Sequence, residues 1–414
     1  MSNTDPIRQR IDDFVIPTYT RFDLVFTHGE GSHLYDADGK RYLDLGTGIA
    51  TACLGHGNTE IAAALAGQAH KLTHVSNLYY TGPQGLLAEK LVGHAGGSGK
   101  VFFCNSGAEA NETLYKLARL HGEAKGKFEI LTTMDSFHGR TLAGIAATGQ
   151  PKVKEGFAPE VEGFRHVPYG NLDAMREAIT PATGGILVEP IQGESGIHCA
   201  TPEYLLGLRQ LCQEHNLLLL LDEVQCGHFR TGKFYGWQTI MADHPDFAPD
   251  ACSMAKSLAG GLPMGAIWAS KPLQDLLGPG RHGTTFGGTP LICAGALKAL
   301  EIIERDGLAQ NAAKLGAYLK KQIEKLITNY PDVLKEVRGV GLMIGVELAE
   351  GIAAFAESKR PASVQMVQRL HDTGLLTIPA GADVFRLLPA LNLTKEDADE
   401  GLVLIESVVK ELVP

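Results

Sequence analysis

The chain has 414 residues and a net charge of −10, from 37 lysines and arginines against 47 aspartates and glutamates. With 44% hydrophobic and 20% charged residues it has the composition of a globular protein, and its length favours two closely packed domains. No dense group of basic residues stands out, so neither nucleic acid nor an anionic membrane is an expected partner.

The expected cellular setting follows from features that the sequence lacks. Residues 1–6 have neither the basic nor the apolar region of a secretion signal, and no apolar run reaches the roughly 18 residues of a membrane span. The seven cysteines form no CxxC pair, and their odd number argues against a disulfide framework and against a zinc site. We therefore expect a cytoplasmic protein without a metal ion.

A hairpin pattern near the N-terminus is followed, through the middle of the chain, by alternating strand and helix patterns. Residues 31–44 alternate apolar and polar side chains around Asp38-Gly39, which is typical of a β-hairpin. Strand-like runs then alternate with helical stretches, at 100–104, 129–132, 185–188, 217–222 and 266–269. This βα alternation predicts an α/β fold with a mostly parallel sheet covered by helices on both faces.

The pattern changes after about residue 300. Leu315, Leu319 and Ile323 fall at helical spacing, strands are expected at 342–348 and 384–388, and a helix at 398–412 closes the chain. We predict a large domain over 59–300 and a smaller α+β domain built from 1–58 and 301–414.

Two reactive residues lie where open α/β sheets bind ligands. The apolar run Leu217–221 predicts a strand buried on both faces, and Asp222 follows at its carboxyl end. Lys256 lies in a small-residue loop after the next strand and would face the same crevice. A carboxylate that pairs with a pyridine nitrogen and a lysine that bonds to an aldehyde are what pyridoxal phosphate requires. For these two residues alone, a strand-end salt bridge is an equally good interpretation.

Four further segments carry candidate site residues. Ser106 with Glu109 fits a capping box, and Gly107 would let a phosphate approach the helix start, although an ordinary capped helix explains the same pattern. Phe137 could stack on a flat ring and Arg140 could bind a carboxylate. Acidic residues at 189 and 194 and a glycine-threonine loop at 281–288 also suit a crevice, and no Gly-x-Ser-x-Gly elbow is present.

Taken together, these segments resemble the class III aminotransferases of pyridoxal phosphate fold type I, above all those for acetylornithine, ornithine and succinylornithine. The resemblance covers nearly the whole chain in the same order, at 46–50, 105–112, 137–141, 189–193, 222–225, 255–256 with 260–263, 284–288, 374–376 and 386–389. This sequence differs from the family's usual lysine loop at Ser257 and Ala259, where the added side chains would tighten the loop or alter its reach to the substrate.

The resemblance implies a role for each cofactor residue. Lys256 would bond to the cofactor and move the proton during catalysis, and Asp222 would pair with the ring nitrogen. The other implied cofactor residues are Gln225 at the ring hydroxyl, Val224 and Phe137 on the two ring faces, Ser106, Gly107 and Ala108 at the phosphate, His138 and Glu189 in the same pocket, and Thr285 from the neighbouring subunit of a homodimer.

The resemblance also implies how two different substrates share one site. Arg386 would bind the α-carboxylate of glutamate, and Arg140 its distal carboxylate or the carboxylate of an ω-amine donor. Glu194 would mask Arg386 while the other substrate is bound, and Tyr19 would help to hold the donor. The implied reaction transfers the ω-amino group of a carboxylate-bearing amine to 2-oxoglutarate, with N-acetylornithine of arginine biosynthesis as the first choice.

Other interpretations remain open at this point. The amine could be 4-aminobutyrate, ornithine, succinylornithine or another donor, and an aminomutase is less favoured because it has no need of the switch between Arg386 and Glu194. A regulator that reuses the fold would carry an added DNA-binding domain, for which the chain has no spare residues.

Overall fold

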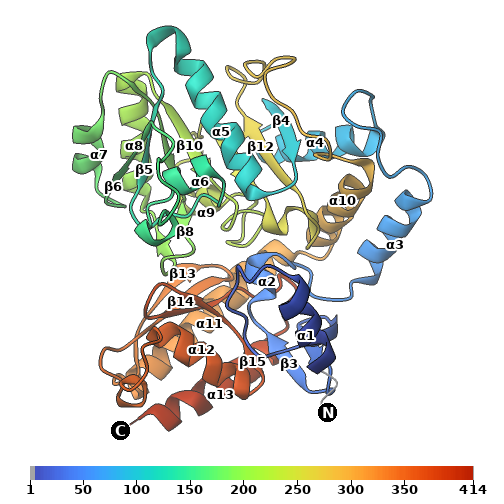
Figure 1. The fold of residues 1–414 in the computed structure, drawn as a ribbon, viewed down its shortest axis with the longest axis vertical. Helices are drawn as coiled ribbons and strands as arrows, with labels where there is room; N and C mark the ends of the chain where they lie inside the picture. The colour runs from blue at the N-terminus through green and yellow to red at the C-terminus, as the bar shows by residue number, and fades with distance from the viewer. Residues whose placement is uncertain (1–4, 414) are drawn as a thin grey trace. The chain divides into compact units, whose positions relative to one another are not determined.

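The computed structural model describes residues 5–413 (Figure 1). The contacts between α-carbons divide them into two compact units, one made of residues 60–309 and the other of 5–59 with 310–413. Among the described residues, no helix is both long and apolar enough to cross a membrane.

A seven-stranded sheet forms the centre of the larger unit. Four parallel pairings run from β11 to β6, whereas β12 is antiparallel to both of its neighbours. The strands lie in the order β4 (Lys100–Cys104), β12 (Gly265–Ala269), β11 (Ala251–Met254), β10 (Leu218–Asp222), β7 (Thr183–Val188), β5 (Glu129–Thr133) and β6 (Phe164–Val167). The predicted mostly parallel sheet is confirmed, and the predicted strands differ from these by at most two residues at an end.

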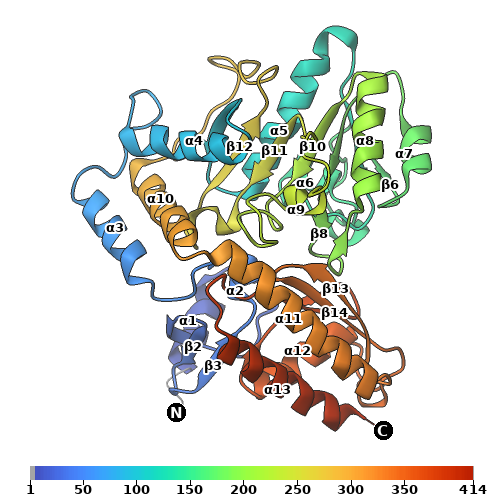
Figure 2. The ribbon, with the colours of Figure 1, turned by 180° about the vertical axis from the view of Figure 1, so that it is seen from behind.

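Helices cover both faces of this sheet (Figures 1 and 2). α5 (Gly107–Gly122) packs on β10, β11 and β12, with Leu114 and Ala118 in the same buried cluster as Leu218 and Leu220. α8 (Pro202–His215) packs on β7 and β10. All five residues of β10 are buried: four leucines, which suit a strand covered on both faces, and Asp222 at the carboxyl end.

The larger unit contains several further elements. They are α3 (Thr59–Ala69), α4 (Gly82–His94), η1 (Glu123–Lys125), α6 (Leu142–Ala147), η2 (Pro151–Val153), α7 (Leu172–Ala178), β8 (Ile191–Gln192), β9 (His198–Cys199), α9 (Gly236–Ile240), η3 (Lys256–Ala259) and α10 (Pro290–Arg305).

The smaller unit holds two four-stranded sheets. The first has the order β1 (Phe26–Glu30), β2 (His33–Asp36), β3 (Arg41–Asp44) and β15 (Leu375–Leu376), and β2 with β3 is the antiparallel hairpin predicted at 31–44. The second has the order β13 (Leu334–Val340), β14 (Met343–Leu348), β17 (Val384–Leu387) and β16 (Ile378–Ala380). Its helices are α1 (Asp5–Phe14), α11 (Leu308–Asn329), η4 (Ala353–Phe355), α12 (Ala362–Asp372) and α13 (Lys395–Leu412).

A short left-handed turn follows β3. In α2 (Thr47–Ala50) the backbone angle φ is 44° at Thr47, 62° at Ile49 and 60° at Ala50. Asp44 stabilises this turn, since its Oδ1 accepts hydrogen bonds of 2.8 Å from the backbone N–H groups of Gly46 and Thr47. No right-handed helix begins at this turn, because these φ values lie in the left-handed region.

Candidate active site

Asp222 ends β10 as a buried carboxylate with three hydrogen-bond donors. Its Oδ2 accepts from Asn111 Nδ2 at 2.7 Å and from His138 Nδ1 at 2.8 Å, and its Oδ1 accepts from the backbone N–H of Val224 at 3.0 Å. Because a carboxylate only accepts, Nδ1 of His138 must carry the hydrogen. Both side chains are almost fully buried.

These donors decide the charge of Asp222. Burial by itself raises the pKa of the carboxyl, because the charged form loses hydration. The hydrogen bond and electrostatic interaction with His138, together with the bonds from Asn111 and Val224, outweigh burial and hold the pKa of Asp222 below its usual value. The carboxylate is therefore ionised at neutral pH and can pair with a protonated ring nitrogen.

Lys256 lies at the same edge of the sheet. β11 runs parallel to β10, with Ser253 opposite Asp222, and the chain reaches Lys256 three residues later. The lysine opens the 3₁₀ turn η3 with φ at 45°, in the left-handed region that a residue with a side chain seldom adopts. Backbone strain of this kind is concentrated at functional sites. Ser257 and Ala259 are buried within η3, so the two added side chains point into the protein.

Glycines bring the other segments against these two. A Cβ placed on Gly107 would lie 2.9 Å from the side chain of Val224 and 3.5 Å from that of Ala255. One on Gly139, where φ is 120°, would lie 3.0 Å from Cβ of Ala108. The start of α5, the strand-end loop after Asp222, the lysine loop and the 137–140 loop therefore meet in one place, and only glycine allows the close approach.

The 189–194 loop joins them through Gln225. A Cβ on Gly193 would lie 2.3 Å from Gln225, whose Nε2 donates to Glu194 at 3.3 Å. Glu189 accepts from the backbone N–H groups of Phe137 at 3.0 Å and Gly193 at 3.4 Å. Burial raises the pKa of Glu189, the His138 ring lowers it, and the charge of Asp222 raises it further.

The start of α5 offers backbone donors. Ser106 caps the helix, with its Oγ accepting from the Glu109 N–H at 3.2 Å. The return bond differs from the predicted capping box, because Glu109 accepts from the N–H of Asn105 at 2.6 Å and not from that of Ser106. Within residues 5–413, the N–H groups of Gly107 and Ala108 have no hydrogen-bond acceptor. Two such donors at a helix start fit a phosphate.

The predicted substrate residues belong to different units. Arg140 is exposed beside Phe137, with its guanidinium carbon 5.7 Å from the ring centroid. Arg386 is buried in β17 and donates from Nη2 to the Pro379 carbonyl at 2.9 Å, and Tyr19 is exposed; both belong to the smaller unit. The pairing of Arg386 with Glu194 joins the two units and stays a prediction.

Thr285 lies in an exposed stretch of a tethered loop. Asn77 Nδ2 donates to the carbonyls of Thr284 at 3.2 Å and Gly287 at 3.0 Å, and Asn105 Nδ2 donates to Thr284 Oγ1 at 3.0 Å. Thr285 and Phe286 are exposed. The loop is thus fixed next to Asn105, just before the start of α5 in its own chain, and Thr285 is exposed.

Asn111 is the residue that the sequence analysis missed. It bonds directly to Asp222 and is 2% exposed. A signal was present, because Asn111 interrupts the apolar face that Leu114 and Ala118 continue, and a polar residue on such a face must find a partner inside the protein. The spacing could not identify that partner.

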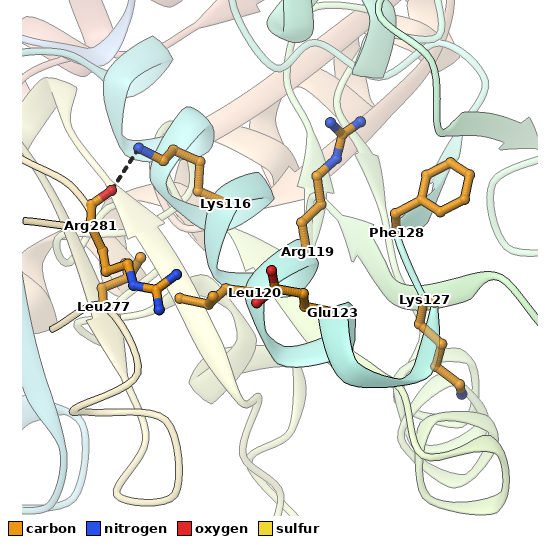
Figure 3. A pocket seen from close by; sticks show the side chains of 9 residues that line it. Lys116, Arg119, Leu120, Glu123, Lys127, Phe128, Leu277 and Arg281 are labelled. Atoms are coloured by element: carbon orange, nitrogen blue, oxygen red, sulfur yellow. Dashed lines mark hydrogen bonds between the residues drawn. The ribbon is translucent and has the colours of Figure 1, made fainter.

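A hollow of the larger unit lies over the C-terminal half of α5 and measures about 480 Å³ (Figure 3). None of the predicted site residues lines it. Three of its four cations already hold backbone carbonyls: Lys116 that of Arg281 at 3.1 Å, Lys127 that of His215 at 2.7 Å, and Arg119 that of Glu162. These side chains stabilise the scaffold.

One group of side chains in the smaller unit has the spacing of metal ligands. The ligand atoms of His33, Asp397 and Glu400 lie within 4.8 Å of one another. Arg41 already supplies a positive charge there, at 2.6 Å from both His33 Nε2 and Glu400 Oε1. The guanidinium of Arg41 therefore supplies the positive charge that a metal ion would otherwise supply to this group.

Comparison with known proteins identifies the family. The model of the class-III aminotransferase family matches residues 15–409. The chain is 42% identical to an acetylornithine aminotransferase of Gloeobacter violaceus over 98% of both chains, and 43% identical to one of Myxococcus xanthus over 96% of both.

Solved structures agree with this. An ornithine aminotransferase of Toxoplasma gondii superposes with a TM-score of 0.91 at 29% identity, over 99% of this chain and 96% of that one. An acetylornithine aminotransferase of Elizabethkingia anophelis superposes with a TM-score of 0.84 at 31% identity, over 99% and 100%. The site geometry and these likenesses lead to one conclusion: the chain belongs to the class-III aminotransferases, pyridoxal-phosphate-dependent transaminases of fold type I.

Proposed function

We propose that this transaminase moves the ω-amino group of N-acetylornithine to 2-oxoglutarate, giving glutamate and a semialdehyde, in arginine biosynthesis. The observation that carries the proposal is the ionised Asp222 on the strand next to the one that leads into Lys256. Support for the donor comes from the relatives named acetylornithine aminotransferase at 41–43% identity. The 29% identical ornithine aminotransferase supports ornithine as the second candidate.

The residues of the larger unit fit the cofactor. Gly107 and Ala108 would bind its phosphate through their N–H groups, with Ser106 beside them, and Val224 and Phe137 would lie on the two faces of its ring. Asp222 would hold the ring nitrogen protonated, and Gln225 would bond the ring hydroxyl, with His138 and Glu189 behind them. When bound, pyridoxal phosphate supplies an aldehyde for the amino group and a ring that withdraws electrons from the adjacent carbon.

Lys256 would be the catalytic base. Its Nζ would hold the cofactor between turnovers and, once released by the substrate amine, take a proton from the substrate carbon and return it to the cofactor. The strained backbone at Lys256 supports this role, because residues held at a left-handed φ are concentrated at functional sites.

Two arginines would bind the substrates. Arg140 would hold the carboxylate of the donor or the distal carboxylate of glutamate. Its guanidinium lies over the Phe137 ring, which supports a place for Arg140 beside the cofactor ring. Arg386 would hold the α-carboxylate of glutamate, Glu194 would cover Arg386 during the other half-reaction, and Tyr19 would contact the donor. An acid that moves away avoids leaving an unpaired buried arginine against an apolar substrate.

The active enzyme would be a homodimer in which Thr285 of one subunit binds the phosphate group of the cofactor held by the other subunit. Exposed apolar side chains near the 284–287 loop support this, since so much apolar surface is costly in water. His74 contacts Phe286, with 5.1 Å between ring centroids, and Asn77 holds the loop. The exposed side chains are Leu78, Tyr79, Tyr80, Leu86 and Phe286.

The domains and the compartment complete the proposal. The large cofactor-binding domain would comprise 59–300 and the small domain 1–58 with 301–414; the division of the described residues into two compact units near 59 and 309 supports this. A cytoplasmic location is supported by seven cysteines that are all free.

A panel of donors tests the reaction. Each of N-acetylornithine, succinylornithine, ornithine and 4-aminobutyrate is assayed with 2-oxoglutarate, and kcat/KM is compared from the glutamate formed. N-acetylornithine should give the highest value. A higher value for another donor would replace the substrate, and product formed without 2-oxoglutarate would indicate an aminomutase.

Two variants test the assigned residues. Lys256→Ala should abolish turnover, and borohydride reduction of the wild type should leave a pyridoxyl group on the peptide that contains Lys256. Arg386→Ala should impair the glutamate half-reaction far more than the amine half-reaction, whereas equal damage to both would contradict the switch.

A further inference from the structure

Asn111 lies on the buried face of α5. Asparagine is a poor helix former, because its side chain competes for backbone hydrogen bonds, and a buried amide is costly unless all its groups are bonded. Its neighbours Ala110 and Leu114 are apolar and fully buried. An alanine or leucine would stabilise this helix better, so a function of the amide group is the better explanation for its presence.

Both hydrogens of the amide are used. One goes to Oδ2 of Asp222 at 2.7 Å, and the other to the backbone carbonyl of His138 at 3.0 Å. The imidazole of His138 donates to the same Oδ2 at 2.8 Å. Asn111 therefore fixes both the carboxylate and the residue that supplies its second donor.

The bonds leave room on the carboxylate for one more donor. An ionised carboxylate has about four acceptor positions, two on each oxygen. Asn111 and His138 fill both positions of Oδ2, and the N–H of Val224 fills one on Oδ1. The remaining position is on Oδ1, and a single ring N–H would complete the set.

We propose that Asn111 is a positioning residue that keeps the Asp222 carboxylate ionised and turned toward the ring nitrogen of the cofactor. The amide is suited to this because it donates at every pH and never competes with Asp222 for a proton. An acid at this position would share a proton with Asp222, and an aliphatic residue would leave Oδ2 with one donor fewer. The proposal rests on the role proposed for Asp222.

The test compares two ligands that differ at the ring nitrogen. The dissociation constants of pyridoxal phosphate and of its 1-deaza analogue, in which carbon replaces that nitrogen, are measured on the apoenzyme. The wild type should prefer pyridoxal phosphate, and Asn111→Ala should narrow this preference about tenfold, because a hydrogen bond to a charged group is lost. If the alanine variant folds poorly, Asn111→Leu can be used instead, because leucine fills the same space. It should narrow the preference for pyridoxal phosphate by the same factor.

A matched control removes a similar asparagine elsewhere. Asn311 donates from Nδ2 to the carbonyls of Leu391 at 2.7 Å and Leu393 at 3.0 Å, in the smaller unit. Asn311→Ala should lower stability and leave the preference unchanged. If the Asn111 variants bind both ligands more weakly by the same factor, Asn111 only joins α5 to the 137–140 loop, and the proposal is wrong.

A further variant separates this failure from failure of the proposed function. Asp222→Asn removes the charge itself and should abolish the preference for pyridoxal phosphate. If it does not, the role of Asp222 is wrong. If it does while the Asn111 variants keep the wild-type preference, only the role of Asn111 is wrong.

Discussion

Asp222 and Glu223 are consecutive buried acids whose pKa values shift in opposite directions. Asp222 faces Asn111 and His138, which hold its pKa down. Glu223 accepts from the backbone N–H groups of Gly236 at 2.7 Å and Trp237 at 2.9 Å, and burial raises its pKa to about 7. The partners of each carboxylate thus decide its state: imidazole and amide donors keep Asp222 ionised, whereas Glu223 accepts from backbone N–H groups at the start of α9.

The largest expected effect contrasts the two acids directly. Asp222→Asn should lower kcat about 10²–10³-fold, the loss typical when one preorganised charge interaction is removed. For Glu223→Gln, kcat should stay within about threefold of the wild type, because Gln Oε1 can still accept from one of the two α9 N–H groups and the bond that is lost lies at the start of α9. Steady-state kinetics at pH 8 measure both, and an equal loss in the two variants would contradict the division of roles.

The pH dependence of stability sharpens the comparison for Glu223. A raised pKa means that the folded state binds a proton more tightly, so its stabilising effect is complete below about pH 4.5 and is lost as pH rises to about 7. The free energy of unfolding of the wild type, relative to Glu223→Gln, should therefore fall by about 2 kcal/mol between pH 5.5 and 8.5. Urea titrations of the apoproteins measure this difference, and a flat difference would show that Glu223 is ionised throughout.

His228 extends the same test to the segment after Glu223. Its ring is buried, both ring nitrogens lack a hydrogen-bond partner among the described residues, and burial lowers its pKa to about 3. The unfolded chain binds a proton below about pH 6.5 and the folded chain does not, so stability falls as pH drops through this value.

Replacing His228 should remove this loss. At pH 5, His228→Phe should be about 2 kcal/mol more stable relative to wild type than it is at pH 8, since 1.5 pH units separate pH 5 from the unfolded pKa. His70→Phe, at an exposed histidine, serves as the control. If the stability difference from wild type depends on pH in the same way for both variants, the lowered pKa of His228 is wrong.

The smallest expected effect is on the affinity for the cofactor, at the start of α5. Gly107→Ala would place a Cβ 2.9 Å from Val224, and the resulting shift of the helix start should weaken binding of pyridoxal phosphate about tenfold. Gly67→Ala, where a Cβ meets nothing within 4 Å, is the control for a helix glycine and should bind normally. Normal binding by both variants would show that the close approach at Gly107 is not needed.

Much of this arrangement could be predicted from the sequence because it depends on local pattern. Leu217–221 predicted the buried strand β10, and parallel neighbours bring the ends of β10 and β11 to one edge, which placed Asp222 and Lys256 together. The reversed direction of β12 could not be predicted, because an apolar strand reads the same in either direction. Nor could the bond from Asn111 to Asp222, which joins residues 111 positions apart.

β10 is the fourth of seven strands, with a hydrogen-bonded neighbour on each side and a helix packed over each face. The amide hydrogens of such a strand exchange with deuterated solvent only when the whole unit opens. Local breathing therefore leaves the strand that carries Asp222 in place. A cofactor that pairs with Asp222, as proposed, would therefore dissociate and bind again without any refolding of this strand.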